Sequence, residues 1–113
     1  MRLLTEEIKK TLPALYTQEN EKDPMVYIKF FDPVGSWTWY VLEGEEQEGD
    51  FLFFGYIVGF EAELGYFTLS QLESAKKGLI GIQALPIERD LYFTPCKLSK
   101  IKTKHNEEYR INS

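Results

Sequence analysis

The sequence contains one cysteine, Cys96, and one histidine, His105. A single cysteine cannot form an internal disulfide, so the chain does not match a secreted scaffold held by disulfides or a cysteine-rich metal centre. No apolar run approaches the ~20 residues that a membrane-spanning helix needs. Charged residues at positions 6, 7, 9 and 10 interrupt the beginning of the chain before a signal-peptide core can form. These absences predict a cytoplasmic protein with no membrane partner.

Positive charge is also scarce, because 13 lysines and arginines stand against 18 aspartates and glutamates, for a net charge of -5. A net negative charge opposes binding to a phosphate backbone, so nucleic acid is not an expected partner. The remaining composition is ordinary for a globular protein, with 43% hydrophobic and 27% charged residues in 113 positions. A chain of this length can enclose one core, which predicts a single domain.

Hydrophobic periodicity and turn residues predict an α+β fold with a curved antiparallel sheet of four to five strands and two short helices. The first helix is expected over residues 5–12, with Thr5 as its N-cap. The second is expected to begin at Thr68 or Ser70, which both have capping-box spacing, and to end at Gly78. Strands are expected at residues 25–31, 37–42, 51–60, 61–67 and 89–95. Short connections between consecutive strands favour antiparallel pairing.

The ordered domain is expected to span residues 1–101. Residues 79–86 have the composition of an irregular apolar link, and residues 102–113 that of a polar C-terminal tail without an anchor in the core. Glycines at 55, 59 and 65 indicate bulges or close backbone approach that would curl the sheet.

Aromatic residues are the abundant class, at 15% of the chain. The segment 51–60 is apolar at both strand parities, with Phe51 and Phe53 on one face and Leu52 and Phe54 on the other. This pattern predicts a strand at or near the centre of the sheet that is covered on both sides. The alternative is an exposed aromatic patch that contacts a partner. The candidates for such a patch are Trp37, Trp39 and Tyr40.

A second candidate binding feature is the acidic stretch 43–50, which is expected to be an exposed connection between two strands. Its carboxylates are Glu43, Glu45, Glu46, Glu48 and Asp50. Such a cluster could steer a basic protein surface toward the domain. The simpler interpretation is a loop that only keeps the protein soluble.

An enzymatic or metal-dependent interpretation depends on a different group of residues. Glu61 and Glu63 share one face of an extended segment and could contact a hard cation. The rest of this carboxylate cluster would be Glu88, Arg89 and Asp90, for which a structural ion pair is the alternative. The sequence has no EF-hand and no glycine-rich phosphate loop, and its only histidine lies in the expected tail. No catalytic residue, metal or cofactor is therefore expected.

The segment 54–60 faintly resembles the aromatic strand of sheets on which the bases of single-stranded nucleic acid stack. The basic residue that begins that motif is missing here, and the surrounding charges are acidic, so this interpretation is not favoured.

Several blocks in order resemble the bacterial family called domain of unknown function 2958. They are MRLLTEEI at 1–8, LPALY at 12–16, VYIKFF at 26–31, WTWY at 37–40, FG at 54–55, GFE at 59–61, ELGYF at 63–67 and LPIERDLYFTP at 85–95. The likeness runs from residue 1 to about residue 101. The link at 79–84 and the tail depart from the family pattern, so neither carries a family role.

The resemblance implies a setting rather than a mechanism. Members of this family look like passengers of plasmids, conjugative elements and phages, often near antirestriction genes, and the family supplies no catalytic residues. We therefore expect an accessory protein of bacterial mobile genetic elements that binds a protein partner without catalysis and modulates host defence. The alternative is a small enzyme or metal-dependent module that uses the carboxylate cluster.

Overall fold

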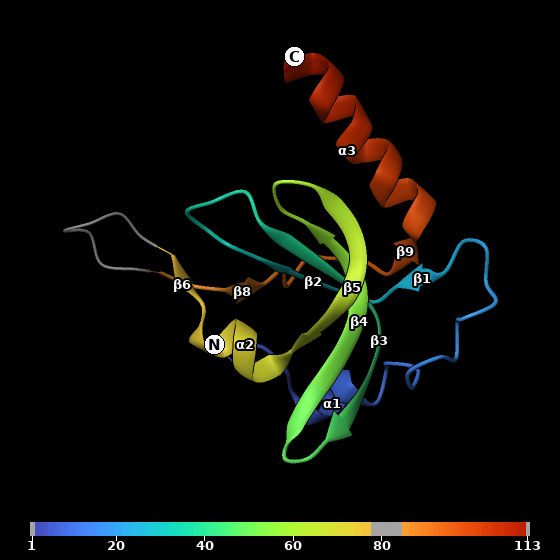
Figure 1. The fold of residues 1–113 in the computed structure, drawn as a ribbon, viewed down its shortest axis with the longest axis vertical. Coiled ribbons are helices and arrows are strands. Elements are labelled where there is room, and N and C mark those ends of the chain that lie inside the picture. Colours follow the sequence, from blue (N-terminus) through green and yellow to red (C-terminus); the bar gives the residue numbers. More distant parts are fainter. Residues whose placement is uncertain (1, 78–84, 113) are drawn as a thin grey trace.

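The fold is built on a five-stranded antiparallel sheet (Figure 1), in a computed structural model that describes residues 2–77 and 85–112. In spatial order its strands are β5 (Ala62–Thr68), β4 (Asp50–Val58), β3 (Thr38–Gln47), β2 (Ile28–Phe31) and β8 (Glu88–Arg89). Every neighbouring pair in this sheet is antiparallel. The predicted α+β class with an antiparallel sheet is therefore confirmed, with β3 in the middle and β4 next to it.

Two small sheets and three helices complete the described chain. β1 (Met25–Val26) pairs with β9 (Cys96–Lys97), and β6 (Lys76–Lys77) pairs with β7 (Leu85–Pro86). The helices are α1 (Glu6–Lys9), α2 (Leu69–Ser74) and α3 (Leu98–Asn112). No described helix is long and apolar enough to cross a membrane.

Two of the predicted strands differ from the structure. The segment 25–31 is divided at Tyr27, so that its first part pairs with β9 and its second part enters the main sheet. The segment 89–95 is not one strand, because β8 ends at Arg89 and a turn follows in which the Phe93 amide donates to the Asp90 carbonyl oxygen at 3.3 Å. Residues 79–84 of the predicted link over 79–86, and Gly78 as a helix end, lie outside the described residues, whereas residues 85–86 form β7 instead of irregular chain.

The sheet has an apolar cluster on each face, as the pattern of residues 51–60 predicted. The first cluster includes Phe30 and Phe53 and is covered by the N-terminal segment, α1 and α2. The second includes Tyr40 and is covered by Leu98 and Ile101 of α3. The coverage is unequal, because Phe53 is fully buried whereas Phe54, on the α3 side, is only half-buried. The face covered by α3 is therefore the more open one.

A β-bulge at residue 42 decides where the acidic stretch lies. The register of β3 against β4 shifts between Val41 and Glu43, so Val41 opposes Gly55 while Glu43 opposes Phe54. The predicted loop over residues 43–50 is wrong, because β3 continues to Gln47 and only Glu48 and Gly49 form the turn. Both turn residues have positive φ, 51° and 79°, as a tight two-residue hairpin requires.

Gly55 permits a close approach between β4 and β3 and does not form a bulge. Gly55 and Gly65 oppose each other in regular register. A Cβ at Gly55 would lie 2.1 Å from the carbonyl oxygen of Tyr40. The alternative of close backbone approach is thus confirmed at Gly55, whereas the only register shift along β3 and β4 lies between Val41 and Glu43.

Both predicted N-caps are confirmed. The Thr5 hydroxyl accepts from the Ile8 amide at 3.3 Å, although α1 ends at Lys9 rather than at residue 12. At α2, Thr68 and Gln71 form the reciprocal capping box, with each side chain accepting from the other residue's amide. The α2 helix ends at Ser74, before the predicted end.

The segment predicted as a tail belongs to α3, which runs through residues 98–112. Its beginning is fixed from a distant loop, because the Asp23 carboxylate accepts from the Ser99 amide at 2.8 Å and from the Ser99 hydroxyl at 2.6 Å. Farther along, His105 Nε2 lies 2.7 Å from the Tyr40 hydroxyl. The expected absence of an anchor beyond residue 101 is therefore wrong at His105. The division into a domain over 1–101 and a separate tail stays a prediction.

The unequal coverage of the sheet predicts unequal costs for two neighbouring phenylalanines. Phe53→Ala should lower the free energy of unfolding by about 3–5 kcal/mol, because it removes a fully buried ring. Phe54→Ala should cost clearly less, because part of that ring is already in water. Urea unfolding of the two variants measures the difference. Equal losses would contradict the assignment of α3 to the more open face.

Hydrogen bonds to serines at two helix beginnings predict a pH dependence of stability. Hydrogen bonds from the Ser99 hydroxyl, which has the larger effect, and from the Ser99 amide lower the pKa of Asp23. Hydrogen bonds from the Ser70 hydroxyl, which has the largest effect, and from the Phe51 amide lower the pKa of Asp50. A carboxyl whose pKa is lower in the folded state stabilises the fold above its ordinary value of 3.8. That stabilisation is lost as the pH falls through the folded-state pKa.

The double variant Asp23→Asn, Asp50→Asn should therefore lose less stability than the unchanged protein between about pH 6 and about pH 3. Urea unfolding at several pH values in this range measures the slope. Glu48→Gln in the β3–β4 turn is the control, because its carboxylate accepts none of the helix-capping hydrogen bonds described above. Identical acid slopes in all three proteins would refute the capping role.

Candidate functional site

The acidic residues of β3 attach the N-terminal segment to the sheet instead of facing a partner. Glu43 is only 4% exposed, and its carboxylate accepts from the backbone amides of Tyr16, at 3.0 Å, and Gln18. Glu45 accepts from the Leu15 amide at 3.0 Å. Between them the Gly44 amide donates to the Pro13 carbonyl oxygen at 3.0 Å. Residues 13–18 thus run along the part of β3 that extends beyond β2.

Gln18 extends this attachment to β1. Its amide nitrogen donates to the carbonyl oxygens of Met25 and Leu42 at 3.0 and 2.9 Å. Its carbonyl oxygen accepts from the Met25 amide at 2.7 Å. One polar side chain therefore joins the N-terminal segment, β1 and β3.

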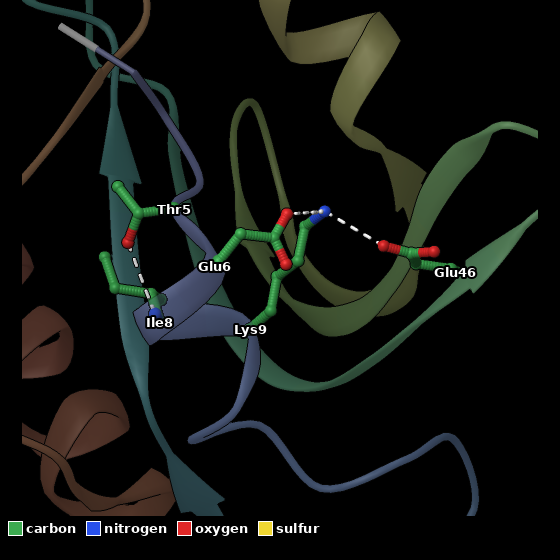
Figure 2. Close-up of polar contacts among 5 residues, drawn as sticks. All are labelled: Thr5, Glu6, Ile8, Lys9 and Glu46. Atoms are coloured by element: carbon green, nitrogen blue, oxygen red, sulfur yellow. Dashed lines mark hydrogen bonds and ion pairs between the residues drawn. The ribbon is translucent and has the colours of Figure 1, made fainter.

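Glu46 faces the opposite side of the sheet, toward α1 (Figure 2). The Lys9 ammonium lies 3.0 Å from both Glu46 and Glu6, and these hydrogen bonds raise the pKa of Lys9. The same ammonium lies 5.7 Å from the centre of the Phe51 ring. Asp50 is also occupied, since it accepts from Ser70 at the beginning of α2. The five predicted carboxylates therefore do not form one surface, and only Glu46 and Glu48 are exposed.

The predicted aromatic patch is also divided by the sheet. Trp39 and Tyr40 are 8% and 3% exposed and belong to the clusters on opposite faces, so the expectation that they form a surface patch is wrong. Trp37 is half-buried and its ring lies 5.7 Å from that of Phe60. Phe60 is 96% exposed and is the aromatic residue that stands in solvent here.

The predicted carboxylate cluster does not assemble. Glu63 lies in β5 and Glu61 immediately precedes it, whereas Glu88 lies in β8 at the other edge of the sheet. Among the described residues no three acidic, histidine or cysteine side chains are close enough to hold a metal ion.

The remaining members of that cluster have structural partners. Arg89 donates to the carbonyl oxygens of Arg2 and Leu3 at 2.8 and 2.7 Å, which holds the N-terminus to β8. Asp90 lies 3.8 Å from the Lys29 ammonium. Arg89 therefore binds backbone carbonyl oxygens, and the ion pair in this segment is the one between Asp90 and Lys29.

Two grooves that the sequence did not predict lie on either side of α3. The β5 groove, of about 320 Å³, lies between the sheet, the loop after residue 16 and α3. Its apolar and aromatic lining includes Tyr16, Leu42, Phe54, Leu64 and Tyr66. The lysine groove, of about 640 Å³, lies between β2, the turn after β8 and α3. Its cationic lining consists of Lys29, Lys100 and Lys104.

Exposed side chains of β5 form the open wall of the β5 groove. Leu64 and Tyr66 are each 50% exposed, although both sit in a regular strand. The Tyr66 ring lies 4.9 Å from that of Phe54, which fixes its base against β4. Hydrogen bonding to Tyr16 raises the pKa of Tyr66, and Tyr16 lines the same groove from the loop. This groove therefore offers aromatic and apolar contacts along an accessible strand.

Contacts between α3 and β3 fix the wall of the lysine groove. The Tyr40 and His105 rings meet edge to face at 5.5 Å, in addition to their hydrogen bond. Phe93 packs against the other side of Tyr40, with ring centres 6.2 Å apart. The sequence signal for this arrangement was the spacing of Leu98, Ile101 and His105, which places three anchors on one face of a helix.

The buried carboxylate of Glu43 generates a prediction about stability. Glu43→Gln should lower the free energy of unfolding by about 1–3 kcal/mol, because an amide group cannot accept from two backbone amides with both of its heteroatoms. Glu46→Gln should change it little, because that carboxylate is exposed and makes only a surface ion pair. Urea unfolding at pH 7 compares the two. Equal effects would show that Glu43 does not anchor the N-terminal segment.

Comparison with known proteins provides a family and no function. No curated protein and no solved structure matches the chain. The model of the family described as "Protein of unknown function (DUF2958)" matches residues 3–109. Because this match covers nearly all of the 113 residues, the chain belongs to that family.

Proposed function

We propose that this protein is a non-enzymatic binding module that captures an extended segment of a partner protein along β5. The observation that carries the proposal is an edge strand that presents two half-exposed apolar side chains, Leu64 and Tyr66, to a groove. The enzymatic alternative receives less support, because its carboxylates lie at opposite edges of the sheet.

The backbone of β5 supports pairing with another strand. β5 is seven residues long and has only β4 as a neighbour among the described segments. Proteins usually protect the edge of a sheet by keeping the edge strand short, by placing charged residues on it or by covering it, because its unpaired amide and carbonyl groups attract other strands. An added strand would satisfy these groups, as in peptide recognition by β-augmentation.

The side chains of β5 specify the chemistry of the partner. Leu64 and Tyr66 are two residues apart and therefore lie on the same face of the strand. A segment paired with β5 would direct every second side chain toward this face and into the β5 groove. The partner segment should thus carry apolar residues at alternate positions, which would contact Leu64, Tyr66 and the loop at Tyr16.

The family resemblance supplies the proposed setting. An accessory protein of a bacterial mobile element would act in the cytoplasm, and its partner would be encoded by the host or by the element. By capturing a host protein, this accessory protein would modulate host defence.

Selection from a library of displayed peptides tests the proposal. We expect the selected peptides to carry apolar residues at alternate positions, and the double variant Leu64→Lys, Tyr66→Lys to bind them at least about tenfold more weakly, since two buried apolar contacts are replaced by charge. The matched control is Leu91→Lys, Tyr92→Lys, which makes the same change at a leucine and a tyrosine outside the β5 groove. These two side chains are 62% and 93% exposed. Binding by the control should be unchanged.

Two results would refute the proposal. One is peptide binding that both double variants retain equally. The other is a concentration-dependent dimer of the protein that the β5 variant abolishes, because the strand edge would then serve a second copy of the chain. Sedimentation analysis of the unchanged protein distinguishes that case.

A further inference from the structure

The sign of the charge reverses at the C-terminal part of this acidic protein. The chain carries a net charge of -5, yet residues 97–105 contain lysines at four positions, one histidine and no acidic residue. These lysines are Lys97, Lys100, Lys102 and Lys104. The net negative charge of the chain therefore does not oppose a phosphate ligand at this surface.

Helix periodicity places two of these lysines in the same groove. Lys100 and Lys104 are four residues apart, which puts them on one face of α3, and both line the lysine groove. Lys29 faces them from β2, and Asp90 is the acidic residue of the lining. Counted over the side chains that the structure describes, the groove thus has three ammonium groups against one carboxylate.

Asp90 is already committed to local contacts. One of its oxygens lies 3.8 Å from the Lys29 ammonium, and the other accepts from the Tyr92 amide at 2.9 Å. Among residues 2–75 and 85–106, whose side chains the structure describes, no carboxylate lies within ion-pair distance of Lys100 or Lys104. These two lysines therefore give the groove a positive potential that an anion can use.

Aromatic rings stand beside this charge. Tyr92 is 93% exposed and lines the same groove, on the turn that Asp90 holds in place. Phe93 and Tyr40 also line the groove, with ring centres 6.2 Å apart. A ring in solvent beside paired lysines matches the two contacts that proteins use for nucleotides, which are stacking on the base and charge on the phosphate.

The wall that carries the lysines is fixed in position. The Tyr40 hydroxyl and His105 Nε2 are 2.7 Å apart, one residue beyond Lys104, while Asp23 holds the beginning of α3 through Ser99. The part of α3 that lines the groove is thus attached at both of its ends. Such preorganisation lowers the entropic cost of binding a ligand.

We infer that the lysine groove binds a nucleotide, with its phosphate on Lys100 and Lys104 and its base on Tyr92. A nucleotide can be free or can be one unit of a single strand, and both present the same phosphate and base. The groove volume of about 640 Å³ lies within the range of small-molecule sites. This site is separate from the β5 groove, so it does not depend on the proposed function.

Calorimetric titration with dTMP, inorganic phosphate and a short oligothymidylate tests the inference. We expect dTMP to bind more tightly than phosphate, and to bind more weakly as salt is added. Lys100→Glu, Lys104→Glu should weaken dTMP binding at least about tenfold, because both phosphate contacts become repulsive. Tyr92→Ala should bring the affinity for dTMP down toward that for phosphate.

The matched control is Lys10→Glu, Lys22→Glu, which makes the same charge change at two lysines outside the lysine groove. It should retain most of the affinity for dTMP, and thermal unfolding of all variants checks that each one is folded. Tighter binding of the oligonucleotide than of dTMP identifies a single strand as the source, and equal binding identifies a free nucleotide.

Three outcomes would overturn the inference. They are no dTMP or oligonucleotide binding at millimolar concentration, equal affinity for phosphate and dTMP, and equal losses in the two double-lysine variants. None of them bears on peptide capture at β5, which the β5 variant tests independently.

Discussion

The arrangement of this molecule depends on the need to solvate one buried carboxylate, that of Glu43. A carboxylate that is 4% exposed must receive hydrogen bonds, since an unpaired buried charge is strongly destabilising. The amides of Tyr16 and Gln18 supply them, and this fixes the loop that leads to β1. From there Asp23 and the Pro24 carbonyl oxygen hold the first turn of α3, so the helix that covers one face of the sheet is positioned by the same chain of contacts.

The bulge in β3 makes this chain of contacts possible. With regular alternation Glu43 would lie on the face of Val41, inside the apolar cluster that α1 and α2 cover. The extra residue moves Glu43 to the other side and leaves Gly44 beneath Phe51, where a Cβ would lie 2.5 Å from the ring. Glu46 consequently faces Lys9 on α1. The carboxylates of Glu43, Glu45 and Glu46 thus contact the N-terminal segment and α1 and not the lysines of α3.

Local signals in the sequence predicted the parts of the fold that depend on local chemistry. The capping box at Thr68 and the apolar alternation around Phe53 act within a few residues, and both were identified correctly. The burial of Glu43 depends on a register shift and on amides almost thirty residues away, which no local pattern encodes. The α3 helix was missed because most of its length is polar, and its anchors meet partners such as Tyr40 only in the folded chain. The grooves could not be predicted for the same reason.

The position of α3 also links the two grooves that flank it. Successive residues on a helix point about 100° apart, so Lys102 lines the β5 groove while Lys100 and Lys104 line the lysine groove. The Lys102 ammonium lies 5.4 Å from the centre of the Tyr56 ring, which ties this side of α3 to β4. A ligand that shifted the helix in either groove would have to move the common wall. The contacts at Asp23 and His105 attach this wall, which both grooves share, to the rest of the fold.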